Sequence, residues 1–565
     1  MVAERLLRPQ VHEPGLARGH DHRQRRRDRP GSGRLRTHRG VRLDRQGGRH
    51  GRAHRPGRRR SVTSTHLRTG APMTTRRLAL ALLLLVVAAP PLAANDTDRD
   101  CRGLVGLTDL DHAVEPGLRV AASKGVPAHC RVRGVVNRAI RFEVTLPDDW
   151  NGRMMFSTVG GAAGFIGDTT SLLGRGFAMA STDTGHEGQD RDYVRQPEAL
   201  LDYAYRGVHL ATAAAKRVIQ RYYGREIDYS YVKGCSNGGR AAMLEATRFP
   251  DDYDGVLAGA PAFRFQEFVP WMIGGARLQA KHPLTAESFQ LLGKASREAC
   301  DALDGVEDGV IDDPTKCTAD VFDLNALQCP PDSTRNCLTA GQLQTARYMY
   351  ADVVDADGNV LSPGVPPGAE DAGDWATWML PTARRGAPDQ SLIDGMDVLL
   401  EALMRFEPDF DVETFDPVAD RDLLAAATAP LDVLTADLSA FRARGGKLLM
   451  YQGWNDYPLR PQRAIDYVRD VEKASGGAGE AADFFRLFMV PGMIHCSRGP
   501  GAWVADYVDP LVAWTEKGIA PERIEASRPG PEPEFTRPLC AWPEAARYSG
   551  EGDVNDAANW SCVLP

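Results

Sequence analysis

The sequence predicts an α/β fold in which a mostly parallel sheet is interrupted by a large, mostly helical insertion. Short apolar strands alternate with helical stretches from about residue 100 to 260. This rhythm is lost between about 262 and 435, and strand patterns return after 436. Alternating strands and helices are typical of a parallel sheet with helices on both faces. The 565 residues suffice for a large core and more than one folding unit.

The first 72 residues do not have the composition of a folded domain. They contain 20 arginines, no lysine and five acidic residues, with almost no apolar periodicity. One interpretation is a basic arm that binds nucleic acid. We favour a mis-assigned start, because residues 73–94 look like a signal peptide. Arg76 and Arg77 precede the apolar run 78–89, and small residues end the segment before Asn95.

Export determines several further expectations. The apolar run is too short for a transmembrane helix, so we expect a secreted or periplasmic protein without stable membrane association after cleavage. Residues 95–565 carry a net charge of −24, which repels phosphate and argues against a nucleic-acid partner. All ten cysteines follow residue 94, and their even number permits five disulfides in an oxidising compartment, although buried free thiols are an alternative.

The elements follow in order along the chain. In the first part of the core, residues 95–261, we expect strands at 139–146, 154–159, 177–181, 229–233 and 255–261, with helices at 204–222 and 240–246. Residues 262–435 are most simply an inserted lid domain, or alternatively an extension packed against the sheet. In the second part of the core, residues 436–565, strands are expected at 447–451 and 485–490.

The strongest motif is Gly-Cys-Ser-Asn-Gly at residues 234–238, between a predicted strand and a predicted helix. This G-x-S-x-G pattern is typical of a nucleophile elbow, a sharp turn that exposes a serine hydroxyl above a helix N-terminus. Glycines on both sides allow the strained turn and the approach of a substrate. Ser236 is therefore the predicted nucleophile, although a glycine-rich turn containing serine by chance is the alternative.

A serine needs a base to remove its proton and a carboxylate to orient that base, and in such sheets the chain order is Ser, Asp or Glu, His. His495 lies after the elbow in a loop that follows a strand, so we assign it as the base. Asp456 directly follows the strand 447–451 and is the predicted acid, although Asp before Pro458 could simply form a turn. His209, on the helix before the elbow, is expected to have a packing or hydrogen-bonding role.

Two further features support this constellation. Cys235 directly precedes the serine and Cys496 directly follows the histidine, so a disulfide between them would hold nucleophile and base together. The oxyanion hole requires two main-chain donors. The amide of Asn237 is one candidate, and Gly160 or Gly161, after an early strand, supplies the other; we select Gly161.

Residues 300–317 form a second motif, in which aspartates, among them Asp301, Asp304 and Asp308, recur with glycines between two cysteines. Closely spaced oxygen ligands suit Ca²⁺. Carboxylates of Asp301, Asp304 and Asp308, with carbonyls of Val306 and Val310, would form a structural site distant from the chemistry, and a Cys300–Cys317 bond would close the loop. An acidic, solvated turn is the alternative. The similar stretch that starts at Asp355 is expected to be a hairpin turn.

The chain resembles the tannase and feruloyl esterase family of exported α/β-hydrolases, which includes the enzyme that hydrolyses mono(2-hydroxyethyl) terephthalate. The resemblance covers nearly all of residues 100–565 and rests on the motifs 234–240, 453–456 and 491–496, the aspartate loop, and the segment 537–543. The pairing of Cys-Ser with His-Cys makes it specific. The chain departs from the family pattern at Gln452, where histidine is common, and in a glycine loop after Val159 with fewer glycines.

This resemblance implies an α/β-hydrolase fold with a lid that selects the substrate, structural calcium, and Ser236, Asp456 and His495 as the catalytic residues. It implies the disulfide pairs Cys235–Cys496, Cys101–Cys130, Cys300–Cys317, Cys329–Cys337 and Cys540–Cys562. The predicted function is a serine hydrolase for small esters of aromatic acids, feruloyl, galloyl or related. A peptidase of the same fold and an inactive calcium-stabilised binding protein are the alternatives. Trp375, Trp378 and Phe406 are candidate walls of the substrate site, although each such residue is more often part of the core.

Overall fold

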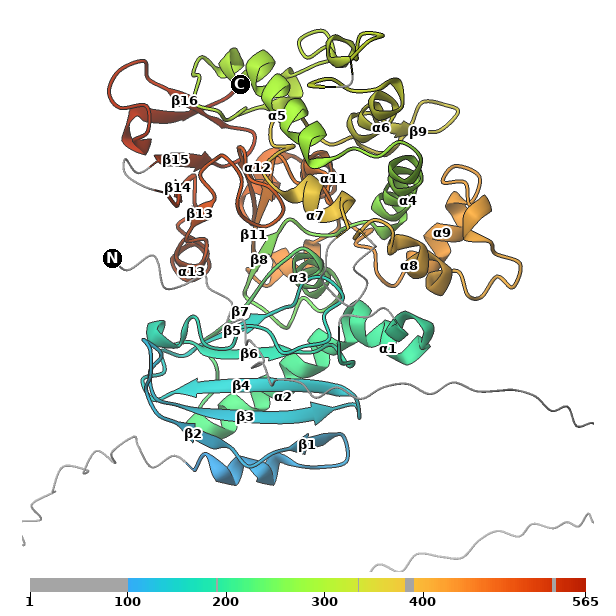
Figure 1. Ribbon diagram of the computed structural model, residues 1–565. Coiled ribbons are helices and arrows are strands. Elements are labelled where there is room, and N and C mark those ends of the chain that lie inside the picture. Colours follow the sequence, from blue (N-terminus) through green and yellow to red (C-terminus); the bar gives the residue numbers. More distant parts are fainter. Residues whose placement is uncertain (1–99, 189–191, 334, 382–390, 531–534) are drawn as a thin grey trace, which may run out of the picture. The chain divides into compact units, whose positions relative to one another are not determined.

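A ten-stranded mixed sheet forms the centre of the fold (Figure 1). The strand order is β1-β3-β4-β6-β5-β7-β8-β11-β12, and β2 also pairs with β3. The strands are β1 (His112–Val114), β2 (Leu118–Val120), β3 (His129–Val136), β4 (Ile140–Pro147), β5 (Arg153–Ser157), β6 (Ala178–Thr182), β7 (Tyr229–Cys235), β8 (Gly255–Gly259), β11 (Lys447–Gly453) and β12 (Phe485–Val490).

This computed structural model describes residues 100–188, 192–333, 335–381, 391–530 and 535–565. They belong to one unit that spans residues 94–565. The arginine-rich stretch 1–72 and the predicted signal peptide 73–94 lie outside the described residues. No helix of the described part is long and apolar enough to span a membrane.

The sheet is parallel only in part, which corrects the expectation of a mostly parallel sheet. From β6 through β5, β7, β8 and β11 to β12, neighbouring strands run parallel. Strands β1 to β4 pair antiparallel, and β4 also runs antiparallel to β6. The β3–β4 hairpin turns through Asn137 and Arg138, both with positive φ. A tight hairpin needs residues with positive φ at its turn, and glycine is the usual choice. Because this turn has no glycine, the sequence does not predict the hairpin.

Helices cover both faces of the sheet. Met154 and Phe156 on β5 point into a core with α2 (Gly207–Tyr223) and α3 (Asn237–Arg248), whereas Met155 points into a core with α13 (Val508–Lys517). This alternation follows from the two-residue period of a strand. The remaining core helices are α1 (Pro197–Leu201), α10 (Ser439–Ala443), α11 (Pro461–Ser475) and α12 (Ala478–Ala482), and a π-helical turn at Asp202–Arg206 precedes α2.

The inserted segment (residues 262–435) leaves after β8 and the chain returns to the sheet at β11, although these two strands are neighbours. Its apolar side chains form a hydrophobic core together with residues from outside the segment, such as Val159 and Tyr457; in this core Trp271 and Trp375 are each 1% exposed. Its helices gather to one side of the sheet in Figure 1. They are α4 (Phe265–Lys281), α5 (Ala286–Cys300), α6 (Ala340–Tyr350), α7 (Asp374–Met379), α8 (Met396–Leu403) and α9 (Arg421–Thr428). A hairpin of β9 (Val353–Val354) and β10 (Val360–Ser362) forms at the turn expected after Asp355.

Two small antiparallel sheets complete the C-terminal part. They contain β13 (Val504–Ala505), β14 (Arg523–Arg528) and β15 (Phe535–Cys540), and β16 (Ala545–Tyr548) with β17 (Trp560–Val563). The structure contains five disulfides, which use all ten cysteines and have the pairing implied by the family resemblance: Cys101–Cys130, Cys235–Cys496, Cys300–Cys317, Cys329–Cys337 and Cys540–Cys562.

Candidate active site

Ser236 lies at the sharp turn between the central strand β7 and helix α3. Its backbone has φ 63° and ψ −127°, a conformation that is rare for a residue other than glycine. The Ser236 amide donates to the carbonyl of Gly259, and its own carbonyl accepts from the amides of Arg240 and Ala262. The strain is therefore held by the surrounding chain, as at functional turns in other proteins. The local geometry is that of a nucleophile elbow.

The structure brings Ser236, His495 and Asp456 into one hydrogen-bonded row. Ser236 Oγ lies 2.9 Å from His495 Nε2, and His495 Nδ1 lies 2.8 Å from Asp456 Oδ2. Asp456 follows β11 and is fully buried, whereas the His495 side chain is 16% exposed. The second Asp456 oxygen accepts the amide of Leu459 at 2.8 Å. A base in this position can take the serine proton while the carboxylate fixes its ring.

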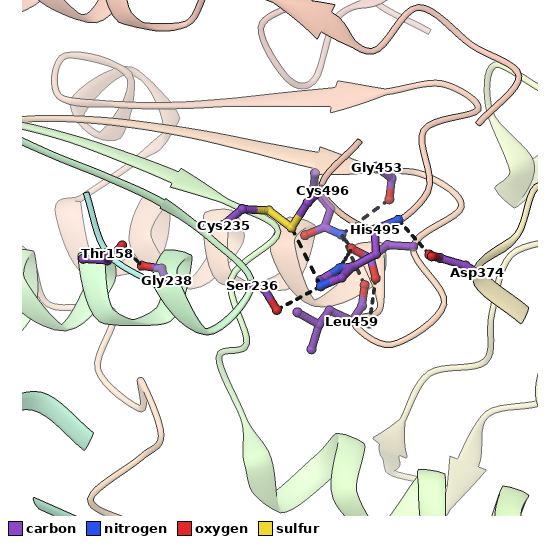
Figure 2. Close-up of a disulfide and its surroundings, with 11 residues drawn as sticks. Thr158, Cys235, Ser236, Gly238, Asp374, Gly453, Leu459, His495 and Cys496 are labelled. Atoms are coloured by element: carbon purple, nitrogen blue, oxygen red, sulfur yellow. Dashed lines mark hydrogen bonds and ion pairs between the residues drawn. A yellow bond between two sulfur atoms is a disulfide. The ribbon is translucent and has the colours of Figure 1, made fainter. Parts of the chain in front are cut away.

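The Cys235–Cys496 disulfide joins the end of β7 to the base loop, beside this row (Figure 2). It links residues 261 positions apart, with a Cα–Cα distance of 6.0 Å. Cys496, like Ser236, has a positive φ, of 64°. The bond therefore fixes the backbone next to both Ser236 and His495 in the folded protein.

The electrostatic surroundings favour a charged imidazole at His495. Burial lowers the pKa of His495, but the negative charges of Asp456 and Asp374 outweigh it, and the pKa lies above its ordinary value. An imidazolium that forms when the serine proton is removed is thus stabilised.

The two predicted oxyanion donors lie beside Ser236. Asn237 begins α3, and Gly161 lies in the loop after β5; both line the same cavity as Ser236 and His495. Gly160 is so close that a Cβ placed on it would lie 3.7 Å from the Cβ of Ser236. The Asn237 side chain is buried and donates to the carbonyl of Val159, which ties the start of α3 to that loop.

A cavity of about 300 Å³ opens above Ser236 and is largely apolar. Its described lining includes no Asp, Glu, Lys or Arg. The inserted segment contributes Phe265, Phe268, Met272, Trp378, Leu392, Met396 and Leu399. Of the three aromatic residues expected as walls, only Trp378 lines it.

The other two candidates do not line the cavity: Trp375 has the core position given as its alternative, whereas Phe406 is on the surface. Trp375 is buried in the core of the inserted segment, against Phe289, Tyr350 and Tyr457. Phe406 is 50% exposed and is not among the residues that line the cavity. An aromatic residue in a helical stretch looks the same in the sequence whether it lines a cavity, lies in the core or is exposed.

Sequence reasoning missed three supporting residues. Asp374, from α7, accepts the backbone N–H of His495 at 2.7 Å. Gln452, noted only as a departure, is buried and donates to Asp456 Oδ2 at 3.2 Å. Arg240 is fully buried and donates to Asn237 Oδ1 and to the carbonyls of Ala204 and Leu431. Arg240 is in the elbow motif itself, whereas no local pattern marks Asp374.

The aspartate loop follows α5 and ends at Cys317, which is bonded to Cys300. Asp301, Asp304 and Asp308 accept backbone N–H groups of Gly309, Val306 and Val310, respectively, so the loop wraps around its own carboxylates. Burial raises the pKa of Asp304 to about 6, and burial with the charges of Asp304 and Asp308 raises the pKa of Asp312 well above its ordinary value. Arg537 pairs with Asp308. This concentration of carboxylates fits a hard cation.

Among the described residues, the three side chains whose potential metal-ligating atoms lie closest together are not in the aspartate loop. One ligand atom each of His209, Glu245 and Asp252 lies within 4.8 Å of the others, a spacing that no three aspartates of the loop reach. His209 Nδ1 is 2.7 Å from Asp252 Oδ2, and its ring stacks on Phe249. The hydrogen-bonding and packing role expected for His209 is confirmed.

The strand order, the elbow on the central strand and the acid and base loops after the next strands define an α/β-hydrolase. Feruloyl esterase B from Aspergillus oryzae has a similar structure, with a TM-score of 0.71 and 26% identity over 82% of this chain and all of that one. An esterase from the same organism gives a TM-score of 0.72 with 28% identity, over 82% of this chain and 99% of that chain.

Sequence comparison gives the family. The model for "Tannase and feruloyl esterase" matches residues 124–563. A mono(2-hydroxyethyl) terephthalate hydrolase from Piscinibacter sakaiensis is 33% identical, over 79% of this chain and 86% of that protein. A probable feruloyl esterase B-2 from Aspergillus fumigatus is 31% identical, over 82% and 91%. The chain belongs to the tannase and feruloyl esterase family, and it is a carboxylic ester hydrolase.

Proposed function

We propose that this chain is a serine esterase that hydrolyses esters of aromatic acids through Ser236, His495 and Asp456. The observation that carries the proposal is the hydrogen-bonded row of these three side chains at one end of an apolar cavity. Ser236 Oγ attacks the ester carbonyl carbon while its proton passes to His495 Nε2. Asp456 keeps the other ring nitrogen protonated and stabilises the positive charge.

The attack gives a tetrahedral intermediate, and hydrolysis is completed in two stages, acylation of Ser236 and then deacylation. Its oxyanion accepts main-chain hydrogen bonds from Asn237 and Gly161, and such donors typically contribute about 10²–10³ in kcat each. The C–O bond to the alcohol breaks, and His495 returns its proton to the leaving oxygen. Water, deprotonated by His495, attacks the acyl-enzyme in the same way, which releases the acid and restores the Ser236 hydroxyl.

The cavity suggests which aromatic esters fit best. Relatives are named for feruloyl esters and for mono(2-hydroxyethyl) terephthalate, whose acyl parts differ in charge. The described lining offers Phe265, Phe268 and Trp378 but no cationic side chain to pair with a substrate carboxylate. The apolar, aromatic lining suits an aromatic acyl group, and the ester panel below decides between a feruloyl ester and a terephthalate half-ester.

Two further properties belong to the proposal. Ca²⁺ would be held by the carboxylates of Asp301, Asp304 and Asp308 and the carbonyls of Val306 and Val310, where it would neutralise their charge and hold the loop folded. The five disulfides support folding in an oxidising compartment, secreted or periplasmic.

An ester panel run with the mature protein, residues 95–565, tests the proposal. Methyl ferulate, methyl gallate, mono(2-hydroxyethyl) terephthalate and a peptide substrate are compared for the wild type, Ser236→Ala and the exposed control Ser561→Ala. We expect turnover of aromatic esters that Ser236→Ala abolishes to below about 10⁻³ of wild type and Ser561→Ala leaves intact. Peptide cleavage without ester turnover would indicate a peptidase. Ester turnover that survives in Ser236→Ala would refute the nucleophile.

A further inference from the structure

One stretch of the inserted segment, residues 360–374, runs along the loops that carry the acid and the base. We call it the strap. Its backbone carbonyls accept side-chain hydrogen bonds from residues on and just after the acid loop: Arg463 to Val360 and Leu361, Arg460 to Pro363, and Asn455 to Pro367. The strap thus follows the chain from the acid loop into α11.

Asp374 ends the strap and contacts both loops. It is 7% exposed and follows Gly373, whose φ of 113° turns the chain into α7. Its carboxylate accepts the backbone N–H of His495 at 2.7 Å and lies near the backbone N–H of Tyr457, the residue after Asp456. Figure 2 shows Asp374 on the side of His495 that faces away from Ser236.

The other contacts of the strap lie in the inserted segment. Glu370 is buried and accepts from the hydroxyls of Ser296 and Tyr350, and Asp371 pairs with Arg297. Helices of the same segment line the cavity over Ser236, whereas Asp374 does not. Asp374 is therefore placed to act on the loops that hold the reacting groups without touching substrate.

We propose that Asp374 is a positioning residue for ester hydrolysis, holding the backbone of the base loop and the acid loop in register so that His495 reaches Ser236. The inference rests on the proposed function. In this arrangement the position of His495 depends on the inserted segment, because a carboxylate from that segment accepts the hydrogen bond of the His495 backbone N–H. Burial raises the pKa of Asp374 to about 6, and above that pH its negative charge further stabilises the His495 imidazolium.

Two substitutions separate these effects. In Asp374→Ala the His495 amide loses its acceptor, and we expect kcat to fall about 10- to 100-fold, since small displacements of reacting groups cost that much. KM should stay within about twofold. Asp374→Asn keeps an acceptor oxygen and should lose less in kcat. Asp374→Asn also removes a negative charge near His495, which should lower the pKa of His495. The acid limb of the variant's kcat/KM profile should therefore move to lower pH.

Asp371→Asn is the matched control, since it breaks an ion pair of the same strap that does not reach the loops. It should keep the wild-type kcat and acid limb. Wild-type kcat in a folded Asp374→Ala protein would overturn the proposal; if that variant does not fold, an unshifted acid limb in Asp374→Asn overturns it. An NMR titration of His495 gives the same shift without ester turnover, so its outcome is distinct from a failure of the proposed function.

Discussion

Glu245 is a buried acidic side chain with no counter-charge in contact. It lies on α3, 1% exposed, and neither of its oxygens has a hydrogen-bond donor in the described structure. Burial, followed by the charge of Asp252, raises the pKa of Glu245 well above its ordinary value. A protonated Glu245 that donates to Asp252 resolves this arrangement, because an unpaired buried carboxylate would be far more costly.

This assignment makes stability depend on pH in a definite direction. Since the folded-state pKa of Glu245 is raised, its contribution to stability is complete below the unfolded-state value of about 4.3 and is lost as pH rises toward the folded-state value. Glu245→Gln cannot lose a proton, so its free energy of unfolding relative to wild type should increase from pH 5 to pH 8. Urea unfolding at the two pH values measures this. An exposed control, Glu551→Gln, should show no trend, and a pH-independent difference for Glu245→Gln would contradict a protonated carboxyl.

At the scale of elements, the elbow between β7 and α3 is built by close backbone approach. A Cβ added to Gly239 would lie 2.3 Å from the carbonyl oxygen of Gly259 and 3.1 Å from the Cα of Pro261. Both obstacles are backbone of the chain that leaves β8, so they cannot move aside as a side chain would. The helix of the elbow therefore depends on glycine at this position for its contact with the sheet.

We expect Gly239→Ala to destabilise the protein by about 1–3 kcal/mol or more, because overpacking of rigid surroundings has a cost of that order. Thermal and urea unfolding of the purified variant measure the loss. Gly106→Ala is the matched control, since a Cβ there meets nothing within 4 Å. Equal stability of the two variants would show that the elbow tolerates a shift of α3.

Sequence patterns predicted those elements in which a local signal coincides with the tertiary role. Ser236, Asp456 and His495 each directly follow a predicted strand, so the carboxyl edge of the sheet brings them together. The strands β1 to β3 were missed because they are short or begin with polar residues, and their pairing depends on a turn without glycine. Asp374 was missed because its partners are backbone amides distant in sequence, which leave no periodicity to detect.

At the scale of the whole described unit, the aspartate loop joins three regions. Its aspartates belong to the inserted segment, Asp308 pairs with Arg537 on β15, and Val310 is buried in a core that includes Met493 of the base loop. The Cys300–Cys317 disulfide closes the loop but does not balance its charge. A cation here would hold together parts of the chain that are more than 200 residues apart.

Removal of Ca²⁺ should therefore lower the stability of the whole unit. A site saturated at 100 times its Kd contributes about 2.7 kcal/mol, so EDTA should lower the Tm of the mature protein and added CaCl₂, but not MgCl₂, should restore it. Asp304→Asn should lower the Tm and make it much less sensitive to EDTA, whereas the exposed control Asp357→Asn should respond like wild type. Activity at 25 °C, below the melting transition, should change little, since the Cys235–Cys496 disulfide holds the backbone next to Ser236 and His495. If EDTA does not change the Tm of the wild type, no cation is bound in the loop. The negative charge of the aspartates would then be offset by Arg537 and by protonation.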